Sequence, residues 1–137
     1  MPDFTDVYKM SKGSPTTAHS AIVATATSDI IDCSGRNALL VYFTSSLTDK
    51  NWTIKVQGCE TRNGTYSDCY ELANTGSMAA MSYQLNSSRI FLFKGIPDWI
   101  KIVATEDADG ATVTVKVQPL NVWGELWVQQ LIPLLPN

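Results

Sequence analysis

The sequence predicts an all-β protein, a single antiparallel β-sandwich or jelly-roll-like domain with N- and C-terminal extensions. Apolar and polar residues alternate with period two in Trp52–Val56 and again in Val113–Val117, which is the spacing of a half-buried strand. Other segments are rich in β-branched and aromatic residues, and turn residues separate them into about seven or eight strands. No segment carries a convincing helical period. The 137 residues, 45% of them hydrophobic, suit one packed core.

The sandwich is expected to span residues 21–120, after an N-terminal arm over residues 1–20 and before an apolar C-terminal arm over residues 121–137. The N-terminal segment has Gly, Ser and Pro at positions 13–15 and sustains no period. Strand signals begin near Ala21, in the β-branched and alternating stretch AIVATATSDIID.

Three strands are expected next along the chain, after a turn at residues 34–37. The run Ala38–Thr44 is apolar, short and β-rich, which favours a central strand buried on both faces. Trp52–Cys59 alternates and forms the second strand. A polar loop containing Gly64 follows, and Tyr66–Leu72 is expected to form a third, short strand.

Residues 73–88, ANTGSMAAMSYQLNSS, are compatible with either a long loop or a short helical turn. Met78 and Met81 lie at a helical spacing, and we expect both to serve in packing. Three clearer signals follow: the β-rich segment RIFLFKGI, the alternating segment WIKIVATE, and ATVTVKVQPL, in which alternate valines face the core. Residues 107–110 form the hairpin loop between the last two.

Composition and charge exclude several classes of partner. The net charge of -3, without a basic groove, argues against direct nucleic-acid binding. No apolar run is long enough to span a membrane, and the N-terminus lacks the apolar core of a signal peptide, so we expect synthesis in a cytoplasm. Only 17% of the residues are charged, which is low for a free monomer and suggests that a partner covers part of the surface.

Catalytic and metal chemistry is not expected. The only histidine, His19, lies in the predicted arm, and Asp107 and Asp109 share one hairpin tip, whereas acid–base work on a sugar needs two carboxylates facing each other across a cleft. A hard cation bound by this pair with Glu106 would lack the ligand spacing of a calcium loop. We therefore predict a non-enzymatic protein without a cofactor or a metal site.

Three cysteines, Cys33, Cys59 and Cys69, are an odd number for a disulfide framework. The last two are too far apart for a C-x-x-C motif, and we expect structural, buried or half-buried thiols. A disulfide formed after lysis and reactive thiols are the alternatives. Exposed tryptophans could stack on sugars, which keeps a carbohydrate-binding module as an alternative function. Trp52 and Trp99 are instead expected to fill the core or cover the sheet.

The C-terminal segment, NVWGELWVQQLIPLLPN, is the most apolar part of the chain. Two arrangements fit it: a last strand folded back on its own sandwich, or an arm that lies on another subunit. The sequence favours the second, because a chain end this apolar needs a cover. We expect a homo-oligomer, a dimer or a trimer. The predicted interface residues are Trp123, Leu126, Trp127, Leu131, Ile132, Leu134 and Leu135.

The order of turns and strands over Thr27–Leu120 carries a family resemblance. Its parts are an Asp and a Gly before an apolar strand (Asp32, Gly35, Ala38–Thr44), a loop and a strand (Ser46–Asp49, Trp52–Gln57), a polar loop ending in an aromatic and an Asp (Tyr66, Asp68), and an Arg-led strand (Arg89–Phe93). IPDWIKIVAT and GATVTVKVQPL match the two closing strands. In this pattern the chain resembles the small all-β capsid decoration (cement) proteins, auxiliary virion proteins of tailed double-stranded DNA bacteriophages.

The resemblance implies a structural virion protein that binds the outside of the assembled capsid and stabilises it. The implied partner is the major capsid protein, and the implied location is the capsid surface. A phage tail or head–tail adaptor component with the same sandwich is an alternative within this class. Attachment would rest on many weak contacts made together.

Overall fold

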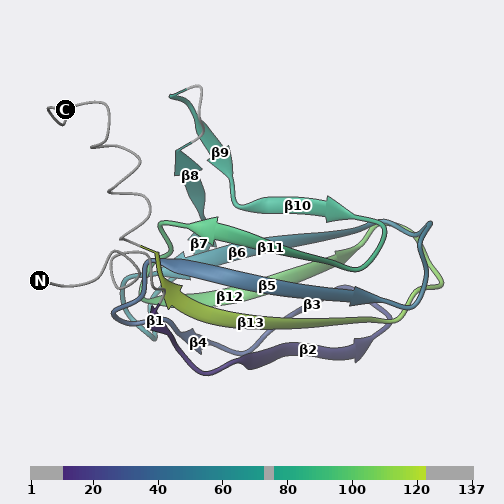
Figure 1. Ribbon diagram of the computed structural model, residues 1–137, viewed down its shortest axis with the longest axis horizontal. Coiled ribbons are helices and arrows are strands. Elements are labelled where there is room, and N and C mark those ends of the chain that lie inside the picture. Colours follow the sequence, from purple (N-terminus) through teal and green to yellow (C-terminus); the bar gives the residue numbers. More distant parts are fainter. Residues whose placement is uncertain (1–10, 73–75, 123–137) are drawn as a thin grey trace, which may run out of the picture.

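The computed structural model describes residues 11–72 and 76–122, which form strands, turns and loops without a helix. The strands build two antiparallel sheets that lie face to face (Figure 1), and this confirms the all-β, sandwich-like architecture. None of the described segments is a helix long and apolar enough to cross a membrane.

The first sheet has five strands in the order β1–β13–β5–β11, with β2 also paired to β13. Its members are β1 (Ser11–Lys12), β2 (Thr16–Ile22), β5 (Ala38–Ser45), β11 (Arg89–Lys94) and β13 (Val113–Asn121). All pairs in this sheet are antiparallel. The last described strand therefore lies in the middle of the sheet.

The second sheet has six strands in the order β10–β6–β12–β3, with β4 paired to β12 and β7 paired to β6. Its members are β3 (Ala26–Thr27), β4 (Ile31–Asp32), β6 (Trp52–Cys59), β7 (Ser67–Asp68), β10 (Ser82–Leu85) and β12 (Trp99–Glu106). A further pair, β8 (Tyr70–Leu72) and β9 (Met78–Ala80), forms a hairpin that projects from the sandwich (Figure 1).

The core lies between the two sheets and follows the period-two pattern of the sequence. The inward positions of β6 and β13 are fully buried, which confirms the faces predicted for both strands. These positions are Trp52, Ile54, Val56, Val113, Val115 and Val117. Burying an aliphatic side chain of this kind contributes roughly 1.5–3 kcal/mol before ordering costs.

The expectation that β5 is buried on both faces holds for one face only. Leu39, Val41 and Phe43 point into the core and are buried. Leu40 and Tyr42 point outward and are only half-buried, because no further layer covers this sheet within the described part of the chain. An apolar run on β5 thus provides the core on one side and a partly exposed apolar surface on the other.

The sandwich begins earlier than residue 21, so the expected arm over residues 1–20 ends too late. Residues 16–22 form β2 and pair with β13, and His19 is buried. The alternating stretch in which the strand signals begin, near Ala21, is divided among three strands. It crosses from the first sheet, where β2 lies, to the second sheet, where β3 and β4 pair with β12.

Two buried polar residues close the sandwich where the chain crosses between the sheets. On the side of β12 that faces β3 and β4, Ile102 lies between the residues that pair with β3 and those that pair with β4, and no strand residue pairs with it there. Its amide instead donates to Ser28 Oγ at 2.9 Å, and its carbonyl accepts from the Ser28 amide at 2.9 Å and from His19 Nε2 at 2.9 Å. His19 lies on β2 of the first sheet, so this hydrogen bond ties the two sheets together. We call this side, made of β2, β3 and β4, the closed side.

Candidate interaction surface

The residues predicted from the sequence to form an interface lie outside the described part of the chain. They are Trp123, Leu126, Trp127, Leu131, Ile132, Leu134 and Leu135. The structure does show where the segment that carries them begins. Val122 is held by the side chain of Asn37, which accepts from the Val122 amide at 2.9 Å and donates to its carbonyl at 3.2 Å.

The point where the described chain ends lies beside the end of β11. The Gly95 amide, which follows β11, donates to the Asn37 carbonyl at 2.7 Å. Asn37, Ala38, Lys94, Gly95 and Val122 line a shallow depression of about 240 Å³ at this corner. Residues 123–137 therefore start next to one edge of the sandwich.

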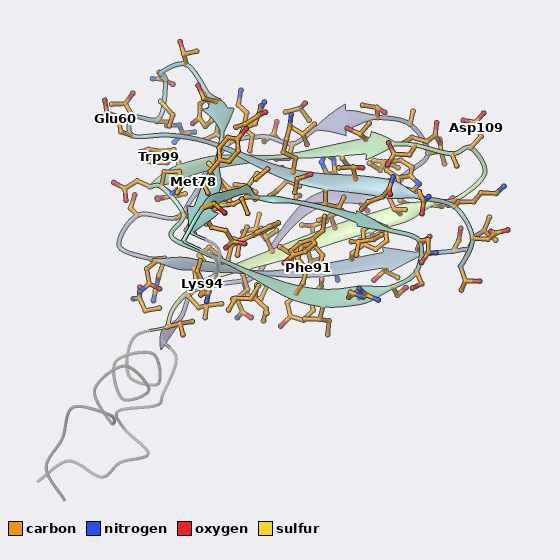
Figure 2. All side chains as sticks on the ribbon, turned by 90° about the horizontal axis from the view of Figure 1, so that it is seen from above. Glu60, Met78, Phe91, Lys94, Trp99 and Asp109 are labelled. Atoms are coloured by element: carbon orange, nitrogen blue, oxygen red, sulfur yellow. The ribbon has the colours of Figure 1, made fainter. Side chains whose placement is uncertain are left out.

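That edge is the side opposite the closed side, and we call it the open edge. It is formed by β10 and β11, the outermost strands of the two sheets. Within the described residues no strand pairs with the outer side of either. Figure 2 looks onto this side of the molecule: Lys94 and Met78 lie towards the end that also carries Trp99 and Glu60, and Asp109 lies at the other end.

Aromatic side chains fill the gap between β10 and β11. Tyr83 of β10 stacks on Phe93 of β11 with ring centroids 5.5 Å apart, and it meets Phe91 edge-on at 5.1 Å. Phe91 and Phe93 form a second edge-on pair at 5.4 Å. Such pairs contribute about 0.5–1.5 kcal/mol each beyond area burial. Phe93 is buried, but Tyr83 is 45% exposed, so side chains rather than hydrogen bonds close this edge.

Apolar side chains continue from the open edge in two directions. On the outer face of the first sheet, exposed Ile90 lies across from Tyr42, and Leu92 lies across from Leu40. On the projecting hairpin, Tyr70 and Met78 are exposed. Six large apolar side chains are exposed in the described residues, and four of them lie on β8–β11. These four are Tyr70, Met78, Tyr83 and Ile90.

The hairpin stands above the open edge and is tied to it. Glu71 Oε2 accepts from the Lys94 amide at 3.2 Å, which links β8 to the end of β11. Glu71 alternates with Tyr70 along β8, so Tyr70 points away from β11. At the base of the hairpin, the Met81 amide donates to the Cys69 carbonyl at 2.9 Å. Arg89 and Lys94, the first and last residues of β11, are exposed cations at the two ends of the edge.

The sequence did not indicate this edge. The described part of this stretch, residues 76–88, contains β9 and β10 rather than a helical turn. Met78 lies on the projecting strand β9 and is 62% exposed, whereas Met81 lies between β9 and β10, hydrogen-bonds to Cys69 and Val56, and is buried. Packing is confirmed for Met81 and is wrong for Met78. The alternating segment MSYQL was the available signal for β10.

A second surface, on the outer face of the second sheet, bears on the carbohydrate-binding alternative. The guanidinium carbon of Arg62 lies 5.6 Å from the ring centroid of Trp99, and Lys101 Nζ lies 4.5 Å from that of Tyr66. Each ring is thus covered on one face by a cation, which leaves less ring surface for a sugar to stack on. Trp99 is half-buried over the sheet and Trp52 is in the core, which confirms their expected places.

Next to these rings lies an open depression of about 450 Å³, lined by Ser28, Asp29, Ile30, Arg62 and Lys101. A third cation nearby is already paired: Lys55 Nζ lies 3.1 Å from Asp68 Oδ1. Hydrogen bonds from Gln57 and Lys55 hold the pKa of Asp68 below its usual value. This face carries a polar and well-paired surface, in contrast to the open edge.

The candidate catalytic residues from the sequence lie apart and have structural partners. His19 is buried against Ile102 on the closed side. Asp107 Oδ2 accepts from Thr53 at 2.6 Å and from Gln84 at 3.2 Å. Burial, then the hydrogen bond to Asp109 and its charge, raise the pKa of Glu106. Among the described residues, no group of three or more His, Cys, Asp or Glu is arranged to hold a metal ion.

The three thiols are free and occupy different environments. Cys33 is fully buried, and burial raises its pKa to about 12, with the charges of Asp32 and Asp98 adding to the shift. Cys59 and Cys69 are half-buried. Cys69 packs against the core, and its pKa is raised by burial and then by Asp68. All three are therefore buried or half-buried, as the sequence indicated.

Comparison with known proteins gives a structural match but no sequence match. No protein-family model matches the sequence, and no curated protein matches it. The structure is similar to the crystal structure of SPBc2 prophage-derived protein YomS, with a TM-score of 0.58 and 20% sequence identity. The match covers 82% of this chain and 96% of that chain. At this level of identity the similarity shows that the chain shares the fold of a prophage-derived protein.

Proposed function

We propose that this chain is a structural protein of a bacteriophage particle that binds the assembled capsid and stabilises it. The observation that carries the proposal is the open edge: the sandwich is closed on one side, and on the other it exposes Tyr83 and Ile90, with Tyr70 and Met78 exposed on the adjoining hairpin. Exposed apolar patches of this kind mark protein-interaction surfaces. The shared fold with a prophage-derived protein and the resemblance of Thr27–Leu120 to decoration proteins support a role in a phage particle.

The proposal includes a homo-oligomer whose C-terminal segments contact neighbouring subunits. The segment 123–137 holds eight large apolar side chains, the seven predicted interface residues and Val128, and one charged residue, Glu125. Fully burying each apolar side chain is worth roughly 1.5–3 kcal/mol, so even a discounted sum offsets the cost of ordering an arm. An oligomer that holds several weak shell contacts at once binds far more tightly than one subunit would.

The test is binding to isolated particles of tailed double-stranded DNA phages. Purified protein is mixed separately with capsid shells, with tails and with an array of glycans, and bound protein is measured by co-sedimentation or array fluorescence. We expect saturable binding to shells at a fixed number of copies, and a higher temperature of shell disruption when the protein is present. Binding to tails alone would support the adaptor alternative. Binding to glycans alone would support the carbohydrate module, and either result would contradict the capsid proposal.

A further inference from the structure

We infer that the open edge is the docking site for residues 123–137 of a second copy of this chain, so that two copies exchange their C-terminal segments. The inference rests on the proposed function only in assuming an oligomer, and it names the surface that receives the segment. The acceptor is formed by β11 with Tyr83 of β10 beside it. The donor is the segment that begins after Val122.

The acceptor needs a cover. An unpaired strand edge with apolar flanks promotes uncontrolled pairing, and proteins usually protect such an edge with charges, prolines or a covering segment. In β11, the charged residues stand only at the ends, Arg89 and Lys94, and the four residues between them are apolar. Ile90 is 63% exposed. The edge is therefore protected at its ends and open to a strand in its middle.

The donor matches the acceptor in length, polarity and charge. Fifteen residues in extended form reach roughly 50 Å, whereas the six residues of β11 span about 20 Å. The segment is apolar, has no basic residue, and carries one acidic residue, Glu125, near its start. The cations Arg89 and Lys94 at the ends of the acceptor complement this charge.

The geometry of the chain end favours exchange between two copies. Val122 is fastened to Asn37 beside Gly95, so the start of the donor and the acceptor lie on the same side of one molecule. When two copies face each other through this side with two-fold symmetry, each donor starts beside the acceptor of the other copy. The two-fold interface then contains the donor–acceptor contact twice, once in each direction, as is usual in homodimers.

A segment docked on its own edge would leave part of the exposed surface uncovered. Tyr70 and Met78 sit on the hairpin that projects beyond the edge, and Tyr70 points away from β11. A strand lying along β11 does not cover them, but the body of a second copy facing this side does. Stable interfaces bury roughly 800 Å² per partner, and Trp123 and Trp127 alone would bury on the order of 300–500 Å².

The test uses full-length variants and sedimentation equilibrium. Ile90→Glu places a charge in the acceptor, and Trp127→Glu places one in the donor. Val23→Glu is the matched control, because Val23 is 64% exposed but lies between β2 and β3 on the closed side. We expect the unaltered chain and Val23→Glu to be dimers. Ile90→Glu and Trp127→Glu should each associate about 100-fold more weakly while keeping the same far-UV circular dichroism spectrum.

Mixing the two weakened variants distinguishes exchange from docking within one copy. Ile90→Glu keeps a working donor, and Trp127→Glu keeps a working acceptor, so the mixture should recover a heterodimer that neither forms alone. The inference is overturned if the unaltered chain is a monomer, if Ile90→Glu stays as tightly associated as Val23→Glu, or if mixing restores nothing. Shell binding plays no part in this measurement. If the protein forms the expected dimer but binds no capsid shell, the proposed function is contradicted and the inference about the dimer is not.

Discussion

The two sides of this sandwich are closed by different means. On the closed side, the chain itself passes between the sheets, and His19 and Ser28 satisfy the backbone of Ile102 with hydrogen bonds of 2.9 Å. On the open edge, β10 and β11 are adjacent in sequence but lie in different sheets, and three aromatic rings span the gap. The two residues that make these contacts on the first side are buried, whereas the second side exposes four of the six large apolar side chains that are exposed in the described residues.

This difference between the two sides suggests that the closed side contributes mainly to the stability of the fold and the open edge mainly to binding a partner. Buried hydrogen bonds between sheets are costly to break, because the groups that lose their partner stay away from water. Exposed rings and aliphatic side chains contribute less to the fold and are available to a partner. Substitutions on the closed side should therefore change the free energy of unfolding and spare association, and substitutions on the open edge should do the reverse. The following predictions test this division, starting with the largest expected effect.

Thiol labelling should show the largest contrast. Cys33 adjoins the closed side, is fully buried and has a pKa of about 12. Its thiolate fraction at pH 8 is about 10³-fold below that of a free cysteine, so it should react at least that much more slowly with a disulfide reagent. Cys69, half-buried at the base of the hairpin, should react faster than Cys33. In denaturant all three should react alike, and equal native rates for Cys33 and Cys69 would contradict the comparison.

His19→Ala should cost about 2–3 kcal/mol of unfolding free energy, because it removes a buried side chain and the hydrogen bond that links the sheets. Urea unfolding followed by circular dichroism measures this cost. Thr17→Ala, an exposed position on the same strand, is the control and should change stability by less than about 0.5 kcal/mol. Self-association of the folded variant should be unchanged. A loss for His19→Ala as small as that of the control would show that the closed side does not depend on this contact.

Tyr83→Ala on the open edge should cost about 1 kcal/mol, less than His19→Ala, because the ring is 45% exposed and the loss is mainly its two ring contacts. Tyr83→Phe keeps the ring and is the control. The Ala variant should weaken self-association more than it weakens the fold. Comparison of urea midpoints with sedimentation data on the same samples checks this, and a stability loss above that of His19→Ala would reverse the comparison.

Ala21→Gly should give the smallest effect, a gain of about 0.5 kcal/mol. Ala21 is the only non-glycine residue with positive φ, 49°, in the described chain, and it sits where β2 ends and the crossing begins. Glycine relieves the left-handed conformation, which costs an L-residue roughly 1–2 kcal/mol, but it adds freedom to the unfolded chain. Thermal unfolding measures the difference. A clear loss of stability would mean that the Ala21 methyl group is needed at the crossing.

The sequence predicted what depends on local alternation and missed what depends on strand order. The valines of β13 and the apolar face of β6 follow period two and were placed correctly. Residues 16–20 resembled an arm because β2 buries a single histidine and shows no apolar period. Alternation tells which face of a strand is inside, but it does not tell which strand ends at an edge. The exposure of Ile90 follows from β11 lying outermost, a long-range property of the pairing.

The position of β13 in the first sheet has a consequence for how the protein is made. This strand lies between β5 on one side and β1 and β2 on the other, yet it is the last described strand to leave the ribosome. Until residues 113–121 emerge, β2 has no partner strand in its sheet, and His19 cannot be held in its buried position beside Ile102. The nascent chain must hold its first strands unpaired through most of translation, when exposed strands are most prone to aggregation. Folding of this sheet therefore follows synthesis of β13 and proceeds through contacts between residues about a hundred positions apart, which favours slow folding.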